Sequence, residues 1–205
     1  MNISRNPRGP RSSRGSHARR AAVAACAAVV LPVSMGVLAP QAFANTTATD
    51  PFGPQCSSLP QKGAGSAASM AAQRVATAAA QNPELSALAA ALRQAGLVDT
   101  LNNAKNVTVF APTNAAFEKI PQADLDALLA DKTQLTKVLT YHVVDEKISK
   151  SQLSNGTFTT LEGSTLSTSG SGSSFKVNDT AKIECGGITT ANATVNLVDT
   201  VLMPK

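Results

Sequence analysis

The chain has 205 residues, of which 43% are hydrophobic and 15% charged, a composition too apolar for a disordered protein. Its formal net charge of +5 comes from the first 20 residues, which hold six arginines and no acidic residue; without residues 1–44 the remaining 161 carry 12 basic and 13 acidic side chains. This balance excludes a basic nucleic-acid-binding domain, because neutralising phosphates needs a clustered cationic surface.

Residues 1–44 have the organisation of a secretory signal peptide. A basic segment is followed by an apolar run from Ala21 to Leu38, and Ala42-Phe43-Ala44 then presents the small residues that a signal peptidase reads. We therefore expect cleavage after Ala44 and a soluble bacterial protein outside the cytoplasm. No stretch after residue 44 is long and apolar enough to span a bilayer.

Three alternatives for this segment are weaker. A membrane anchor conflicts with Pro32, which interrupts the apolar run. Val23-Ala24-Ala25-Cys26 resembles a lipoprotein box in which Cys26 would carry the lipid, but the apolar run continues past it. Arg19-Arg20 would suit twin-arginine export, although the residues after the pair fit that motif poorly.

Export changes how the cysteines are interpreted. Cleavage removes Cys26 and leaves Cys56 and Cys185, and two thiols in an oxidising compartment most simply form one disulfide. The alternative is a redox or metal pair, but there is no C-x-x-C, and His142 alone is too little to complete a zinc site. We expect neither a metal nor a cofactor.

The first half of the exported chain carries helical patterns. Residues 45–66 are rich in Thr, Ser, Pro and Gly and are expected to form a flexible N-terminal lead that is tied down at Cys56. Helices are then predicted over 67–81, over 83–95 with Asn82 as cap and Gly96 as stop, as one turn at 97–101, from Thr113 or Asn114 to Ile120, over 124–130, and from Thr133 to His142.

Strand patterns dominate the second half. Val107–Phe110 is one early strand by its β-branched residues. Further strands are predicted over 157–161, 165–168, 175–177, 182–185 and 195–202, with a hairpin-like loop at 169–174. Helices first and strands later indicate an α+β fold, and the absence of an internal repeat indicates one domain over 67–204.

Few residues offer catalytic chemistry. His142 lies seven places after Leu135 on the apolar face of the last helix, so its ring is predicted to point toward the core. Asp145 and Glu146 are adjacent in an extended segment and point to opposite faces, which disfavours an acid–base pair. With one histidine after residue 44 and no G-x-S-x-G elbow, we expect no enzyme.

Three blocks of the sequence resemble signatures of the fasciclin (FAS1) domain family. They are Thr108-Val109-Phe110-Ala111-Pro112-Thr113-Asn114-Ala115-Ala116-Phe117, Leu139-Thr140-Tyr141-His142-Val143-Val144, and the closing segment from Ala191 to Pro204. The lead around Cys56, the start Asn82-Pro83-Glu84-Leu85 and Cys185-Gly186-Gly187 are similar to the small secreted mycobacterial antigens of this family, the MPB70/MPT83 group. Many family members have His where this chain has Asn196, so a role of that His does not carry over.

The resemblance implies two β-sheets in a wedge or sandwich with helices packed at one side, and a Cys56–Cys185 bridge. It also implies a secreted, non-catalytic binding or cell-adhesion module whose partner is an extracellular or cell-surface protein or matrix component. One alternative is a carrier that holds a small apolar or carbohydrate ligand in a cleft between helices and sheets. A hydrolase using His142 is another.

The candidate partner-binding residues are expected to be exposed in two segments, a turn at 113–117 and the segment 141–146. They are Thr113, Asn114, Tyr141, His142, Asp145 and Glu146. The family associates the Tyr-His segment with adhesion in its animal members. The competing interpretation is that His142 is a core histidine bonded to the backbone, with Tyr141 packed beside it, and the apolar stripe favours this interpretation. Asp199, amid apolar strand residues, either faces water or accepts a specific hydrogen bond.

Overall fold

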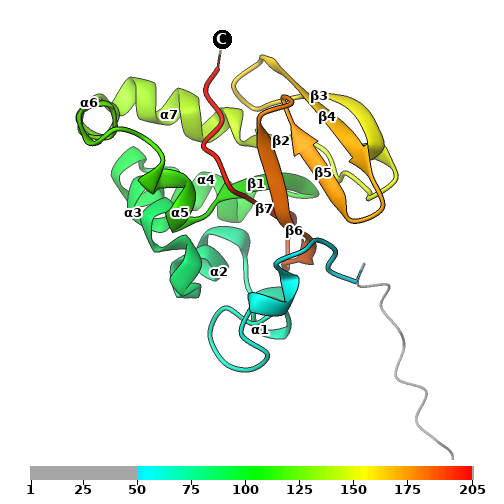
Figure 1. The fold of residues 1–205 in the computed structure, drawn as a ribbon. Coiled ribbons are helices and arrows are strands. Elements are labelled where there is room, and N and C mark those ends of the chain that lie inside the picture. The colour runs from blue at the N-terminus through cyan, green and yellow to red at the C-terminus, as the bar shows by residue number, and fades with distance from the viewer. Residues whose placement is uncertain (1–49, 205) are drawn as a thin grey trace, which may run out of the picture. The chain divides into compact units, whose positions relative to one another are not determined.

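The computed structural model describes residues 50–204 (Figure 1). The predicted signal peptide, the cleavage after Ala44 and the possible lipid site at Cys26 lie outside the described residues. Within residues 50–204, most helices precede most strands, and the predicted α+β class is confirmed.

The helices follow the sequence signals with two exceptions. Gly96 ends one helix in a left-handed conformation with φ of 75°, and the Asn82 side chain accepts a hydrogen bond from the Glu84 amide. The helices are α1 (Ala67–Ala71), α2 (Val75–Gln81), α3 (Ser86–Ala95), α4 (Val98–Asn103), α5 (Asn114–Glu118), α6 (Gln122–Ala130) and α7 (Lys132–Tyr141), with single 3-10 turns at Cys56–Ser58, Pro83–Leu85 and Gln152–Ser154.

The first exception is the predicted helix over 67–81, which is two helices with a break at residues 72–74. Distant side chains hold the new N-terminus: Asn192 Oδ1 accepts from the Val75 amide at 2.9 Å, and Asn102 Oδ1 accepts from the Ala76 amide at 3.2 Å. The first amides of a helix have no partner inside it, so these two asparagines act as its caps. The alanine-rich sequence itself contains no signal for this break.

The second exception is the start of α7. Thr133 was predicted as its cap, but Asp131 occupies that position, and its carboxylate accepts from the amides of Thr133 and Gln134 at 2.9 and 3.1 Å. A carboxylate also interacts favourably with the positive end of the helix dipole, which a hydroxyl does less well.

Seven strands form one continuous mixed sheet. The strands are β1 (Val107–Pro112), β2 (Val143–Val144), β3 (Asn155–Thr159), β4 (Thr165–Ser171), β5 (Ser174–Val177), β6 (Ala181–Thr189) and β7 (Ala193–Val198). Their order is β2-β1-β7-β6-β5-β4-β3; β1 and β7 are parallel, and every other pair is antiparallel. An isolated bridge between Val144 and Thr160 brings the two ends of this order together. The long strand β6 pairs with β7 on one side and with β5 on the other, and we call the two halves of the sheet on either side of β6 the two sides of the wedge.

Both faces of the central strands are buried. Val107, Val109 and Ala111 of β1 pack in a cluster with the helices, whereas Phe110 points into a second cluster with side chains from β4 to β6. Figure 1 shows the helices on one side of β1 and β7 and strands β3 to β5 on the other. Phe110 is fully buried, and burial of such a side chain contributes about 1.5–3 kcal/mol.

The described part of the predicted lead, residues 50–66, packs on β6. Phe52 and Gly186 exchange backbone hydrogen bonds of 2.9 and 2.7 Å, and Cys56 is bonded to Cys185, the pair that the resemblance implied. A side chain at Gly186 would clash, since its first carbon would lie 2.6 Å from the Phe52 ring and 2.7 Å from Asn196 Oδ1. The glycine therefore permits this close approach.

Candidate functional site

His142 lies at the C-terminal end of α7, in the interior of the protein. Its ring is 2% exposed, as expected for a core histidine. Nδ1 lies 2.7 Å from the Val138 carbonyl oxygen and Nε2 lies 2.9 Å from the Leu202 amide nitrogen. A carbonyl only accepts and an amide only donates, so Nδ1 carries the proton and Nε2 is the acceptor.

These contacts define what the ring can do. Burial, opposed in part by the hydrogen bond to Val138, lowers the pKa of His142 from 6.5 to about 4, so the ring is neutral at neutral pH. Both ring nitrogens are engaged by the backbone. A general base needs a free lone pair within reach of the hydroxyl that it activates, so this arrangement does not suit the hydrolase alternative.

Tyr141 is also buried, and it connects α7 to the β4–β6 side of the wedge. Its hydroxyl donates to the Thr165 carbonyl at 3.1 Å and accepts from Asn178 Nδ2 at 2.8 Å. The ring is 3% exposed. Neither Tyr141 nor His142 is exposed as a partner-binding residue would be. The competing interpretation, a core histidine with a packed tyrosine beside it, describes this segment: His142 ends the apolar stripe of α7, and Tyr141 packs in the second cluster with Phe110.

Thr113 and Asn114 follow β1 and bind two other elements: Thr113 contacts β7, and Asn114 contacts the start of α3. Thr113 is buried, which contradicts the expected exposure, because its amide donates to the Val198 carbonyl at 3.1 Å and holds it against β7. Asn114 is half-buried and caps another helix: its Oδ1 accepts from the Ala87 amide at 3.0 Å and its Nδ2 donates to the Pro83 carbonyl at 2.8 Å. Both residues therefore act in the scaffold.

Asp145 and Glu146 are exposed in the turn after β2, as expected of solvated loop charges. The structure joins the two predicted segments through the β1–β2 pair, where the Phe110 amide donates to the His142 carbonyl at 2.8 Å. The backbone after β2 is fixed by the Thr108 hydroxyl, which donates to the Glu146 carbonyl at 2.7 Å and accepts from the Ile148 amide. Of the six candidates, only these two carboxylates are fully exposed.

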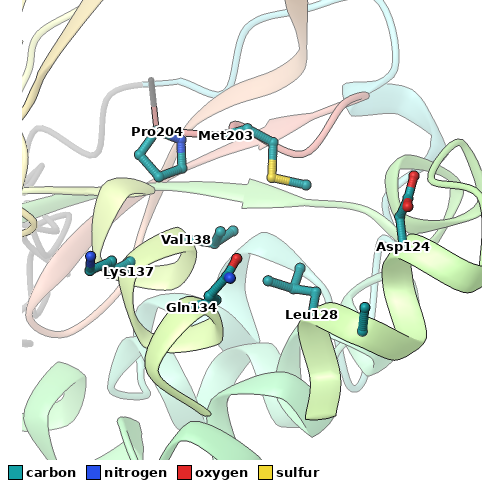
Figure 2. Close-up of a pocket in the computed structure, with 8 residues that line it drawn as sticks. Asp124, Leu128, Gln134, Lys137, Val138, Met203 and Pro204 are labelled. Atoms are coloured by element: carbon teal, nitrogen blue, oxygen red, sulfur yellow. The ribbon is translucent and has the colours of Figure 1, made fainter. Parts of the chain in front are cut away.

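Met203, the most exposed large hydrophobic residue between residues 50 and 204, follows the residue that His142 binds and was not predicted to belong to a site. His142 accepts a hydrogen bond from the Leu202 amide, and the Leu202 side chain is buried. The next residue, Met203, is 47% exposed. It forms one wall of a groove of about 480 Å³ between α6, α7 and the C-terminal segment. Figure 2 shows Met203 reaching over Leu128 and Val138, with Asp124 and Lys137 at the two ends.

Sequence periodicity missed this groove because Met203 follows the last strand in a segment without regular structure. The only sequence signal for the groove was Met203 itself, a large apolar residue that lies after the last predicted strand and that no predicted element would bury. In the described residues, Met203 and Leu161 are the only large hydrophobic side chains classed as exposed.

Asp199 accepts specific hydrogen bonds, one of the two expected outcomes. Its Oδ1 accepts from the Lys182 amide at 2.7 Å, and its Oδ2 pairs with Lys119 Nζ at 3.1 Å. Partial burial alone would raise the pKa of Asp199, but the hydrogen bonds from Lys182, Lys119 and Thr200 outweigh burial and lower it. The carboxylate thus ties the end of α5 to β6 and lies apart from the groove.

Known proteins resemble this chain along most of its length. The sequence model of the fasciclin domain family matches residues 83–204. "Immunogenic protein MPB70" of Mycobacterium bovis is 43% identical over 182 residues, which cover 86% of this chain and 88% of that protein. "Cell surface glycolipoprotein MPB83" of the same organism is 50% identical over 147 residues, covering 69% of this chain and 66% of that protein.

A solved structure of a FAS1 domain pair from the insect cell adhesion molecule fasciclin I aligns with 58% of this chain and 45% of its own, at 17% identity and a TM-score of 0.47. Between residues 50 and 204, no helix has both the length and the apolar character needed to cross a membrane.

Proposed function

The chain belongs to the fasciclin domain family, and we propose that it is a non-catalytic binding module that works outside the cell, with residues 1–44 removed on export. The names of its relatives, an immunogenic protein and a cell surface glycolipoprotein, support this location. A disulfide supports it as well, since such bonds persist in oxidising compartments.

The observation that carries the proposal is the groove beneath Met203. The protein has two closed apolar clusters, and yet it leaves this large side chain 47% exposed over a floor made by Leu128 and Val138. Methionine is unbranched and flexible, so it adapts to partners of different shape. An accessible apolar surface with polar residues around it is typical of a site that contacts another molecule.

The partner that fits this groove is a protein segment with an apolar side chain between charged neighbours. The floor is apolar, Gln134 offers an amide beside it, and the two ends carry opposite charges from Asp124 and Lys137. In the described residues neither of these charges forms a salt bridge within the chain. A partner with complementary charges on either side of an apolar anchor would satisfy both ends.

A carrier function is the second candidate, because the groove volume of about 480 Å³ lies within the range of small-ligand sites. The two candidates differ in what occupies the groove. A carrier retains a small molecule through purification, which native mass spectrometry detects as added mass, whereas the binding module is isolated without one.

The test uses photo-methionine in place of methionine, with cross-linking on the surface of the producing cells or on their extracellular matrix. Met70 is 1% exposed, so within residues 50–204 Met203 is the only methionine open to a partner. We expect a cross-linked protein whose junction peptide contains Met203, and we expect Met203→Lys to abolish binding of that protein. The matched control is Leu161→Lys, which changes the other exposed large hydrophobic residue and leaves the groove intact. The proposal is contradicted if both variants lose binding of that protein equally, or if no cross-linked peptide contains Met203.

A further inference from the structure

A second surface, on the outer face of β3 and β4, has a chemistry different from that of the groove. The side chains of these strands alternate, and Phe158 and Leu166 are buried on the inner face. The outer positions are occupied by hydroxyl or amide side chains throughout, in the residues Asn155, Thr157, Thr159, Thr165, Ser167 and Ser169. They stand in cross-strand pairs, among them Thr157 with Ser167 and Thr159 with Thr165.

β3 and β4, the last strands of the sheet order, contribute no charged side chain to this face. Neither β3 nor β4 contains a charged residue. Strands at a sheet edge commonly carry lysine or other charges on their exposed positions, which prevent pairing with other chains. A neutral face of paired hydroxyl groups departs from that pattern and is suited to a neutral, polar ligand.

A polar pocket of about 310 Å³ opens on this face. It is lined by Tyr141, Thr157, Thr165, Ser167, Asn178 and Asp179, among others. Asn178 and Asp179 occupy a tight turn with φ of 49° and 57°, closed by the Thr180 amide donating to the Val177 carbonyl at 3.1 Å. Their side chains are therefore presented from a fixed backbone.

Hydrogen bonds from the interior hold Asn178 in place and leave part of the pocket open to a ligand. Asn178 Nδ2 donates to the buried Tyr141 hydroxyl at 2.8 Å, and its Oδ1 accepts from the Ser167 amide at 3.0 Å. The second N–H of Asn178, the Asp179 Oδ2 atom and the hydroxyls of Thr157 and Thr165 form no hydrogen bond within residues 50–204. The pocket thus offers one amide donor, one carboxylate acceptor and hydroxyls that do both.

From this arrangement we propose that the pocket and the hydroxyl rows beside it bind a neutral oligosaccharide. Each hydroxyl of a vicinal pair on a sugar can both donate and accept a hydrogen bond. The Asn178 amide can donate to it, the Asp179 carboxylate can accept from it, and the threonine hydroxyls can do either. The Asp179 carboxylate disfavours anionic ligands such as phosphates or sulfated glycans by like-charge repulsion. The site shares no lining residue with the groove beneath Met203, so it adds a second ligand to the proposed binding module.

The experiment titrates the full 15N-labelled chain with mannan, dextran and arabinogalactan as neutral probes and with dextran sulfate as the anionic comparison. We expect amide shifts confined to β3, β4 and the turn at Asn178 with at least one neutral probe. Thr157→Val with Ser167→Ala, and separately Asn178→Gly, should weaken binding at least tenfold; glycine suits the left-handed turn, so the second variant preserves the backbone.

The matched control combines Thr189→Val and Ser58→Ala, which removes the same two hydroxyl types outside this face. It should bind the neutral probe as the parent protein does. Three results overturn the proposal: no shift with any neutral probe, binding of dextran sulfate alone, or equal affinity of the face variants and the control. The Met203 cross-linking experiment has its own outcome, which does not depend on sugar binding. Failure of this proposal can therefore be distinguished from failure of the proposed groove function.

Discussion

The Nε2 atom of His142 lies 2.9 Å from the backbone nitrogen of Leu202, so a ring at the end of α7 holds the segment that forms one wall of the groove. The two residues are 60 positions apart in the sequence. Tyr141, the neighbour of His142, holds Asn178 in the polar pocket in a similar way. The buried Tyr-His segment therefore supports both candidate surfaces from the interior, and of its two residues only Tyr141 lines one of them, the polar pocket.

Replacing His142 with alanine should destabilise the protein by about 3 kcal/mol or more, since it leaves a cavity and two unpaired backbone groups. Urea unfolding measures the loss. Amide hydrogen exchange should show Leu202 exchanging at least tenfold faster while Val109 in β1 stays protected. Thr133→Ala, an exposed change on the same helix, should stay within about 0.5 kcal/mol of the parent. Unchanged exchange at Leu202 would show that the ring does not hold this segment.

The protein should lose stability as the pH falls from 7 to 4. The folded pKa of His142 is about 4, below the ordinary 6.5, so between these values the unfolded state binds a proton that the folded state excludes. The contribution of His142 to the free energy of unfolding is thus complete above the unfolded-state pKa. It is lost as the pH falls, and by the folded-state pKa the loss is about 3 kcal/mol. The measurement is urea unfolding at pH 7, 5.5 and 4.

The control for this pH effect is His142→Gln, which lacks the titrating group but retains the other acidic and basic residues. The pKa of Glu184 is raised, first by partial burial and then by Asp199, and this opposing contribution is present in both proteins. The parent should therefore lose more stability than His142→Gln over this pH range. Parallel curves for the two proteins would mean that the ring is not responsible.

Removing the disulfide should be strongly destabilising. Cys56 and Cys185 are 129 residues apart, and closing so long a loop stabilises a protein by roughly 4–5 kcal/mol in the chain-entropy model. We expect the double change Cys56→Ala with Cys185→Ala to lower the urea midpoint accordingly, and reduction of the parent protein to have a similar effect. A midpoint that does not move would show that the Phe52–Gly186 pairing alone fastens the lead.

Asn192 should be among the polar residues most sensitive to substitution. Its Oδ1 caps α2 at Val75, and its Nδ2 donates to the carbonyls of Leu101 and Ala104 at 2.8 and 2.9 Å. Asn192→Ala should lose about 2 kcal/mol or more, because it leaves these groups without partners. Asn155→Ala, an exposed asparagine on β3, is the control and should change stability little. Similar unfolding midpoints for both variants would contradict this role.

The exported protein should begin at Asn45. Its intact mass should lie two hydrogens below that of the reduced chain because of one disulfide, and reduction should add them back. A lipid-sized increase on a chain that begins at Cys26 would instead support the lipoprotein alternative. N-terminal sequencing of material from the culture medium and from the cell surface distinguishes these outcomes.

Much of the fold could be predicted because its signals are local. Helical periodicity, the cap at Asn82 and the stop at Gly96 each depend on a few neighbouring residues, and so does the alternation of Thr, Val and Phe in the later strands. Three short motifs in family order identified the domain, and the family match confirms it. The inward direction of His142 was predicted in the same way, from its place on an apolar stripe.

Other features were decided only when distant segments met. Asn102 and Asn192 divide one alanine-rich run into two helices, and the Val198 carbonyl of β7 accepts from the amide of the buried Thr113. In each case a group far along the chain satisfies a backbone amide that no neighbour reaches. The groove beneath Met203 and the pocket beside Asn178 exist because Leu202 and Asn178 bind consecutive residues of α7 and its cap. Periodicity reports which side of an element is apolar, whereas the shape of a binding surface depends on which elements pack together.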